Sequence, residues 1–238
     1  MRLVATSALL LVAGAGWTLA AQEGPPADST RADSLRPVLL APVVVSVTRS
    51  PTDPGRVPFA VATVLRDEIA RGRPTQSLSE ALITVPGVFI ADRNNPSQDD
   101  NLSIRGFGAR SAFGARGVKI LLDGIPQTLP DGQGQLSNVE LARVSRVEIL
   151  RGPSSSLYGN ASGGVISLWT DVVRPPGVQL ESRAFWGAYG TWKAFVGVTA
   201  PLGRGVLSAD GSSWATNGFR DHSQGETQIG RASCRERV

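Results

Sequence analysis

The feature that most constrains this chain is a strict alternation of side-chain type between residues 192 and 200. Apolar residues stand at every second position, with mixed ones between them: Trp192, Ala194, Val196, Val198 and Ala200 against Lys193, Phe195, Gly197 and Thr199. Because successive side chains of a strand point to opposite faces, this period of two predicts a sheet with one apolar face. A transmembrane β-barrel has this pattern, with its apolar side chains outward. A soluble antiparallel sheet with one wet face alternates in the same way, so both readings stay open here.

Neighbouring segments extend the pattern. Leu180, Ala184 and Trp186 alternate with Glu181, Arg183 and Phe185 in a strand of their own. The sequences "GAYGT" and "PLGRG" supply turns, and a third strand is predicted over residues 206–215. We therefore expect residues 175–228 to hold about three antiparallel strands.

Residues 51–174 carry the helix and strand boundary signals of an α+β domain. Strands are expected at residues 60–65, 88–91, 102–105, 118–122, 144–150 and 165–169, with helices near residues 67–71 and 77–84 and a helical turn near Val139. Ser77 and Glu80 have the spacing of a capping box, which predicts Ser77 as the N-cap of the second helix.

The N-terminal segment has the features of export. Arg2 precedes an uncharged run that ends in small residues, which indicates a signal peptide over residues 1–20; a membrane anchor is the weaker alternative. Residues 21–41 are rich in Pro, Ser and Asp and are expected to form a flexible leader. Residues 42–50 follow with a run of β-prone valines, which predicts either the first strand of the domain or a strand held free to pair with a partner's sheet.

The last ten residues, "IGRASCRERV", resemble a translated sequencing adapter, and we interpret residues 229–238 as an artefact rather than a natural basic tail. They contribute three Arg, one Glu and the only cysteine, Cys234. Without them and without Arg2 in the signal peptide, the formal net charge falls from +4 to +1. This charge gives no support for nucleic-acid binding.

Enzymatic function is poorly supported by the sequence. The chain has one His, His222, so neither a metal cluster nor a Ser-His-Asp arrangement is indicated, and no cofactor is expected. "GFGARS" begins like a dinucleotide fingerprint but has Ser111 where the third glycine belongs. Asp99 and Asp100 are interpreted as a solvated loop rather than an acid–base pair. "RGPSSSLYGNASGGV" follows a strand directly, and its serines lack an activating histidine.

Three separated motifs carry a resemblance to a known family. In order, "LSEALITVPGV", "LSIRGFGARSAFGARGVKILLDGIP" and "RVEILRGPSSSLYGNASGGVISL" resemble the plug domain of TonB-dependent outer-membrane receptors, over roughly residues 42–170. The resemblance implies an α+β plug domain followed by an antiparallel transmembrane β-barrel, in the outer membrane of a Gram-negative-type bacterium. It also implies that the glycine-rich run is a packed corner without chemistry.

The same resemblance implies roles for particular residues. The partner protein TonB, with its inner-membrane energising complex, would pair with Val43, Val44, Val45, Ser46 and Val47. Arg105 and Arg151 would anchor the plug to glutamates of the barrel. Ligand contacts would come from three loops and comprise Arg93, Arg110, Ser111, Phe113, Gln127, Thr128, Asp131 and Gln133.

The implied function is active import of a scarce ligand, not catalysis. The motifs are most similar to the subgroup assigned to uptake of pyrroloquinoline quinone, a tricarboxylate that suits the guanidinium groups of Arg93 and Arg110. Ferric siderophores and ferric citrate are the alternative ligands. A secreted binding or adhesion module without transport is the alternative of another class.

Barrel size leads to a further expectation. Plugged transporters of this kind have 22 strands of about ten residues, or roughly 220 residues before loops. Residues 177–238 number 62. We therefore expect the chain to be a fragment that holds the plug and the first barrel strands.

Overall fold

The computed structural model describes residues 45–236 except residues 93, 94, 96, 97 and 113. The predicted signal peptide and leader, together with Val43, Val44, Arg93 and Phe113, lie outside the described residues. Among the described residues, no helix is long and apolar enough to cross a membrane.

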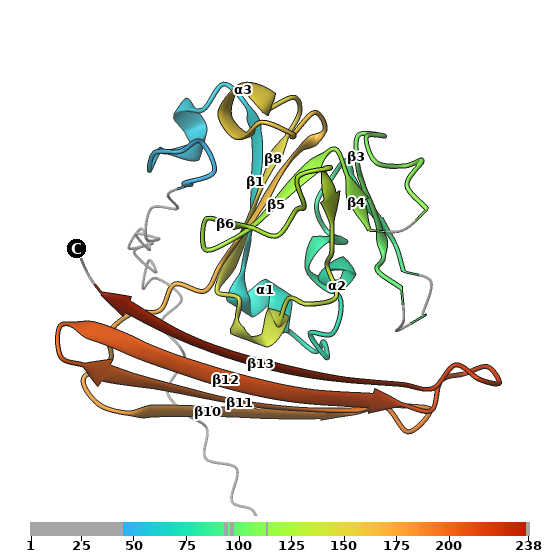
Figure 1. Ribbon diagram of the computed structural model, residues 1–238, viewed down its shortest axis with the longest axis vertical. Coiled ribbons are helices and arrows are strands. Elements are labelled where there is room, and N and C mark those ends of the chain that lie inside the picture. Colours follow the sequence, from blue (N-terminus) through green and yellow to red (C-terminus); the bar gives the residue numbers. More distant parts are fainter. Residues whose placement is uncertain (1–44, 93–94, 96–97, 113, 237–238) are drawn as a thin grey trace, which may run out of the picture. The chain divides into compact units, whose positions relative to one another are not determined.

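The domain over residues 51–174, here called the plug after the resemblance described above, is built from short strands and helices (Figure 1). Its helical elements are η1 (Pro54–Arg56), α1 (Arg66–Ala70), α2 (Leu78–Leu82), η2 (Leu141–Arg143) and α3 (Ser155–Tyr158). Its strands are β1 (Ala60–Leu65), β2 (Val88–Ala91), β3 (Asn101–Ile104), β4 (Ala115–Arg116), β5 (Val118–Leu122), β6 (Ile125–Pro126), β7 (Gln133–Gly134), β8 (Arg146–Arg151) and β9 (Gly164–Trp169).

These strands form two sheets. The larger has the order β1-β8-β9-β5-β6 and the smaller β2-β3-β4-β7. β8 pairs antiparallel with β1 and β9, whereas β5 pairs parallel with β9. The hydrophobic core comprises side chains of both sheets, α1, α2 and the turn around η2, including Ile69, Leu82, Ile104, Ile120 and Ile166. Figure 1 shows α3 and the blue segment before β1 at one end of the long strands β1 and β8, with α1 and α2 at the other end.

Local signals predicted α2 well. Ser77 is its N-cap, the Ser77 side chain accepts from the N–H of Ser79, and Glu80 accepts from the N–H of Ser77, as the capping box requires. The helix ends two residues earlier than the predicted end at residue 84. Strands β4, β6 and β7, each of two residues, were not predicted. Such short strands exist only because a partner strand lies beside them, so no local pattern indicates them.

The glycine-rich run after β8 is a packed corner, as the resemblance implied. Gly164 begins β9 with φ +147°, and a Cβ there would lie 2.4 Å from the backbone oxygen of Leu150. A Cβ on Gly163 would lie 2.5 Å from the Cβ of Phe107. Close backbone approach, not chemistry, explains these glycines.

Replacing Gly164 with Ala is therefore expected to destabilise the plug by about 3 kcal/mol, since it combines backbone strain with a steric clash. Thermal unfolding of the purified protein, with proteolysis of the plug as a second measure, tests this. Gly177→Ala is the matched control, because a Cβ on Gly177 meets nothing within 4 Å. Equal unfolding midpoints for the two variants would contradict the packed-corner interpretation.

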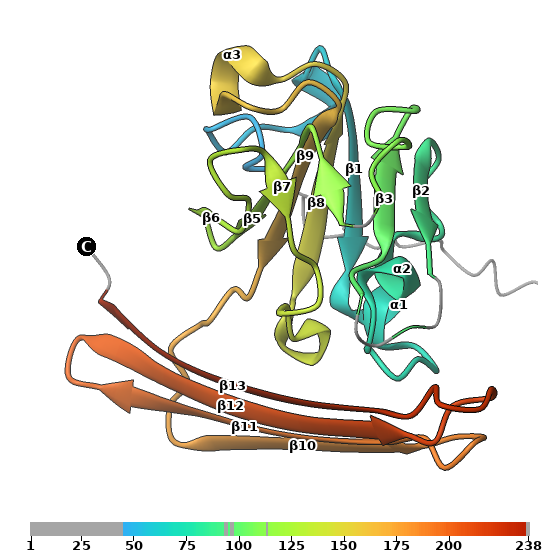
Figure 2. The ribbon, with the colours of Figure 1, turned by 45° about the vertical axis from the view of Figure 1, so that its right-hand side comes forward.

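The C-terminal quarter of the chain is one antiparallel sheet. Its strands are β10 (Gln179–Trp186), β11 (Trp192–Leu202), β12 (Gly205–Thr216) and β13 (Gly225–Glu236), and they pair in sequence order (Figure 2). The predicted alternation is confirmed in β11, where Lys193, Phe195 and Thr199 are buried while Val196 and Val198 are exposed. The three strands expected within residues 175–228 are β10, β11 and β12; a fourth, β13, begins at Gly225 and continues beyond residue 228.

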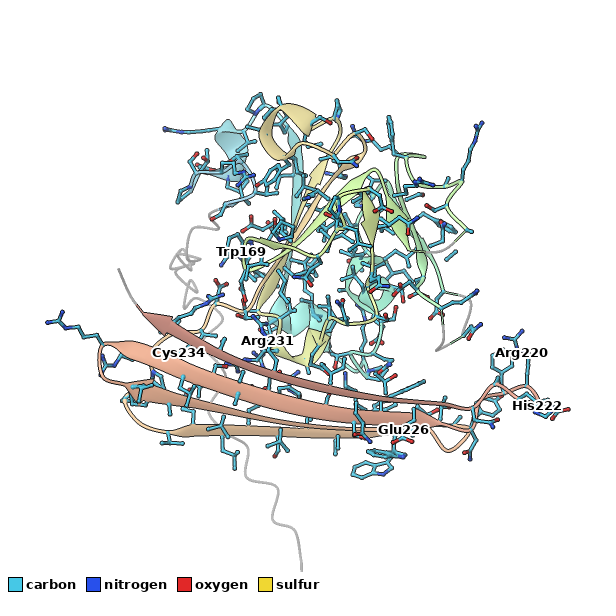
Figure 3. All side chains as sticks on the ribbon, viewed as in Figure 1. Trp169, Arg220, His222, Glu226, Arg231 and Cys234 are labelled. Carbon is cyan, nitrogen blue, oxygen red and sulfur yellow. The ribbon has the colours of Figure 1, made fainter. Side chains whose placement is uncertain are left out.

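β13 runs through residues 229–236, inside the segment interpreted as an adapter. Its backbone pairs with β12 from Thr216↔Gly225 to Gly205↔Glu236. Backbone pairing would form whether or not residues 229–238 were encoded by an adapter, so the interpretation as an artefact remains a prediction. Figure 3 shows Arg220 and His222 on the turn that joins β12 to β13, and Cys234 toward the other end of β13.

Candidate functional site

The segment predicted to bind TonB is packed against the plug. Val45 and Val47 are fully buried, and Val45 forms an isolated antiparallel bridge with Thr52. The segment is therefore neither a regular first strand nor a free one. Val43 and Val44 lie outside the described residues.

Two plug side chains hold this segment. The carboxylate of Glu148, in the middle of β8, accepts from the N–H groups of Ser46 and Val47, each at 2.8 Å. The hydroxyl of Tyr158, in α3, donates to the carbonyl of Val47 at 2.6 Å. Burial raises the pKa of Tyr158, which the nearby guanidinium of Arg49 opposes and Glu148 reinforces. The tyrosine therefore stays a hydrogen-bond donor at neutral pH.

Sequence reasoning missed Glu148 and Tyr158 because both are separated from the segment by about a hundred residues. The one available signal was Glu148 itself: a glutamate inside a strand that is otherwise apolar, "VEIL", needs a partner when buried. It carried no indication of which partner.

The predicted ligand-contacting residues fall on two plug loops joined by neighbouring strands. Arg110 and Ser111 lie between β3 and β4, while Gln127, Thr128, Asp131 and Gln133 surround β6 and β7. β4 pairs with β7, which brings the two loops onto the same small sheet. The second loop is closed on itself, since Thr128 bridges to Gly134 and Asp131 accepts from the N–H of Gln133. Among the described residues, no hydrogen bond joins one loop to the other.

A cavity of about 840 Å³ opens elsewhere. None of the predicted ligand residues that the structure describes lines it. Its lining combines carboxylates and amides of the plug with aromatic and hydroxyl side chains at one end of the C-terminal sheet. These include Asp92, Asn95, Gln98, Asp99, Asp100, Asn138, Tyr189, Thr191, Trp214, Thr216 and Phe219. The sequence did not indicate this cavity, because its residues come from segments far apart in the chain.

Asp99 and Asp100 are not the solvated loop that the sequence predicted. The Asp99 carboxylate accepts from the N–H groups of Leu136 and Ser137 at 3.1 and 2.8 Å. Asp100 accepts from the hydroxyl of Ser77. Burial raises the pKa of Asp100, with added repulsion from Asp92 and Asp99, while the Ser77 hydrogen bond opposes the rise. Both carboxylates thus position the plug loops at the edge of the cavity.

The plug and the C-terminal sheet are joined by polar contacts. Lys193 of β11 donates to the Glu140 carboxylate and to the Thr75 carbonyl, both at 2.8 Å, and Ser212 of β12 also donates to Glu140. Arg143 donates to the hydroxyls of Thr199 and Ser208 at 2.9 and 2.7 Å. Lys193, Glu140 and Arg143 are all buried. These residues were not predicted as anchors.

The predicted anchors, Arg105 and Arg151, form no ion pair among the described residues. Arg151 donates instead to the carbonyls of Pro86 and Ala60, at 2.7 and 3.4 Å. Arg105 is exposed, with its backbone N–H donating to the carbonyl of Gly87 at 2.8 Å. Their pairing with barrel glutamates stays a prediction.

Comparison with known proteins gives a family match over part of the chain. Residues 53–165 match the family model of the TonB-dependent Receptor Plug Domain. Among solved structures, the pyoverdine outer membrane receptor from Pseudomonas aeruginosa PAO1 aligns with a TM-score of 0.62 at 20% identity, covering 79% of this chain and 27% of that one. The copper transporter OprC aligns with a TM-score of 0.54 at 19% identity, covering 70% and 26%. The ferric yersiniabactin uptake receptor from Yersinia pestis aligns with a TM-score of 0.51 at 21% identity, covering 66% and 24%.

These structural alignments show a similarity of fold alone. The chain spans about a quarter of the length of each of these structures.

Proposed function

We propose that this chain is part of an active importer that carries a scarce small ligand across the outer membrane; the match of residues 53–165 to the family model of the TonB-dependent Receptor Plug Domain supports this. The observation that carries the proposal is the continuity of the plug with a sheet that is polar toward the plug and apolar on its other face. Lys193 and Arg143 represent the polar side, with their bonds to Glu140 and to sheet hydroxyls. In a soluble protein, the apolar face that is turned away from the plug would be left in contact with water.

The outer face of β10–β12 suits lipid. Leu180 and Val196 are 72% and 50% exposed, and Trp186 is 77% exposed. Trp186 and Trp192 flank the β10–β11 turn, at the place where a membrane barrel carries its aromatic girdle. We propose that these strands open a 22-stranded barrel, with the leader in the periplasm and the plug in the lumen.

Energy coupling would use residues 43–47. Main-chain pairing of an extended segment with the edge of a TonB sheet gives affinity without a particular side-chain sequence. The experiment that tests the proposal compares ligand accumulation in isogenic cells with and without TonB. Accumulation that does not depend on TonB would favour the binding or adhesion module instead.

For the ligand, pyrroloquinoline quinone is our first candidate. It rests on the motif resemblance and on Arg93 and Arg110, whose guanidinium groups suit carboxylates. A ferric siderophore is the second candidate. The described cavity lining carries Asp92, Asp99 and Asp100 and no Arg or Lys, so it would repel a tricarboxylate more than a neutral siderophore. The names of the pyoverdine and yersiniabactin receptors agree with this second class.

Replacing both Arg93 and Arg110 with Gln is expected to weaken binding of the quinone about a hundredfold, since two charge-assisted hydrogen bonds are lost. The salt dependence of binding should flatten as well. Titrations with the quinone, ferric citrate and a neutral hydroxamate siderophore measure this. Arg204→Gln, in the exposed turn between β11 and β12, is the matched control. Tightest binding by the neutral siderophore, unchanged by the double substitution, would show that the electrostatic argument is wrong.

A further inference from the structure

We propose that the plug and the C-terminal sheet enclose a binding site for a small organic carboxylate, in a second cavity of about 380 Å³. Among the described residues, this cavity shares only Pro74 with the lining of the larger one. Its described lining carries three cations, Arg73, Arg183 and Lys193, and no carboxylate. The site is argued from these contacts alone and depends neither on import nor on TonB.

One wall of the cavity is a patch on the plug-facing side of β10 and β11. Arg183 lies opposite Phe195 in the strand register, and Phe185 lies opposite Lys193. Side chains two positions apart share one face of a strand, so the four form a square with the cations at opposite corners. Diagonal neighbours of this kind are about 7 to 8 Å apart. Both cations can therefore reach one carboxylate, whose apolar body would lie on the two rings.

The opposite wall is the loop between α1 and α2, which contains a strained residue. Thr75 is buried and β-branched, yet its φ is +56°, a value that such residues rarely adopt. Its carbonyl accepts from the Nζ of Lys193, and its N–H donates to the Glu80 carboxylate, both at 2.8 Å. Arg73, in the same loop, donates to the carbonyl of Glu80. Strain of this kind persists where the surroundings enforce it, and it concentrates at functional sites such as ligand clamps.

The three cations keep hydrogen-bond donors that no described residue occupies. An ammonium group has three N–H donors and a guanidinium has five. Lys193 donates to two oxygens and Arg73 to one. Arg183 contacts the carboxylate of Glu181 at 2.9 Å. The remaining donors can serve an oxyanion, and charge-assisted bonds to a carboxylate are stronger than neutral ones.

Carboxylates near the cavity do not balance its positive charge. The single carboxylate of Glu181 is shared by three guanidinium groups. Among the described residues, the cations at this contact are Arg66, Arg73, Arg143, Arg183 and Lys193, and the carboxylates paired with them are Glu140, Glu181 and Asp210. Positive groups so close together repel one another where water is scarce, and a bound anion would offset that repulsion.

The volume and the apolar part of the lining limit the kind of anion. Sites for small molecules commonly measure about 300 to 1,000 Å³, so a cavity of about 380 Å³ suits one small acid. Phe185 and Phe195, with Ala70 and Ala142, supply apolar surface. Inorganic phosphate would satisfy the cations but leave this surface in contact with water, whereas an aromatic carboxylate would cover it.

Benzoate and its neutral isostere benzamide test the site in the purified full-length protein. Equilibrium dialysis at low ionic strength is expected to show saturable benzoate binding, with benzamide bound about tenfold more weakly because the charge-assisted bonds are lost. Benzoate should also raise the thermal unfolding midpoint, since it binds the native state. Equal affinities for the two probes, or tighter binding of phosphate than of benzoate, would overturn the proposal.

Substitutions then locate the bound benzoate. Arg73→Gln and Arg183→Gln are each expected to weaken its binding about tenfold. Arg73→Lys keeps the positive charge and should bind benzoate more tightly than Arg73→Gln does. Arg174→Gln, at an exposed arginine between β9 and β10, is the matched control and should bind as the parent does.

The unfolding midpoint of each variant without ligand separates lost binding from lost folding. The proposal requires weaker binding in a variant that still unfolds cooperatively near the parent's midpoint. Parental affinity in both Gln variants would place the bound benzoate elsewhere and refute the site. Equal losses in Arg73→Lys and Arg73→Gln would refute it as well, because the charge at position 73 would then contribute nothing.

Discussion

Deletion of residues 43–47 is expected to abolish ligand uptake while leaving ligand affinity within about twofold of the parent. In the proposed function TonB pairs with the main chain of this segment, so removing the segment would eliminate the mechanical connection rather than weaken it. Its described residues, Val45, Ser46 and Val47, do not line the cavity. Uptake assays in cells and ligand titrations on isolated membranes measure the two quantities separately.

The matched control deletes residues 27–31 from the predicted leader, which shortens the chain equally and keeps the segment. It should retain uptake. Parallel loss of binding and uptake on deletion of residues 43–47 would mean that the segment supports the plug and does not couple energy. Receptor abundance in the membrane, measured for both deletions, shows whether the loss of the Glu148 and Tyr158 contacts affects folding.

Lys193→Met is expected to destabilise the contact between plug and sheet by about 3 to 5 kcal/mol, because it leaves Glu140 buried without its cation. The side chains of Lys193 and Glu140 are only 6% and 5% exposed, and their ion pair measures 2.8 Å. The expected result is rapid proteolysis of the plug and a lower unfolding midpoint. Lys119→Met, on β5, is the control, since Lys119 forms no ion pair among the described residues.

The double variant Glu140→Gln with Lys193→Met tests the reason for this loss. Removing both charges leaves no uncompensated ion in the interior, so most of the stability should return. A double variant as unstable as Lys193→Met alone would show that the lysine acts through packing of its aliphatic stem rather than through charge.

The sequence predicted those features that depend on residues close together in the chain. The capping box of Ser77 and Glu80 and the alternation in β11 depend on residues a few positions apart, and both predictions were confirmed. The three motifs resemble a TonB-dependent receptor plug domain, and residues 53–165 match the model of that family.

The features that the sequence did not predict depend on contacts between residues far apart in the chain. The two-residue strands β4 and β7 form by pairing with each other. The carboxylate of Glu148 accepts hydrogen bonds from amides about a hundred positions away in the chain. Glu140 and Lys193 each look like ordinary surface residues until the sheet folds onto the plug. Asp99, interpreted as solvated, is occupied by the N–H groups of Leu136 and Ser137, which no local pattern could indicate.

The polar contact between the plug and β11–β12 has a mechanical consequence. Arg143 bonds to the hydroxyls of Thr199 and Ser208, and Glu140 to Lys193 and Ser212. When such a contact is pulled apart, water can take the place of each lost partner, whereas separated apolar surfaces would meet water at a cost proportional to their area. The work of displacement is then largest at the start, while the groups are still dry, and falls once solvent enters. Such a contact resists thermal fluctuation, but under a sustained pull it separates over a short distance.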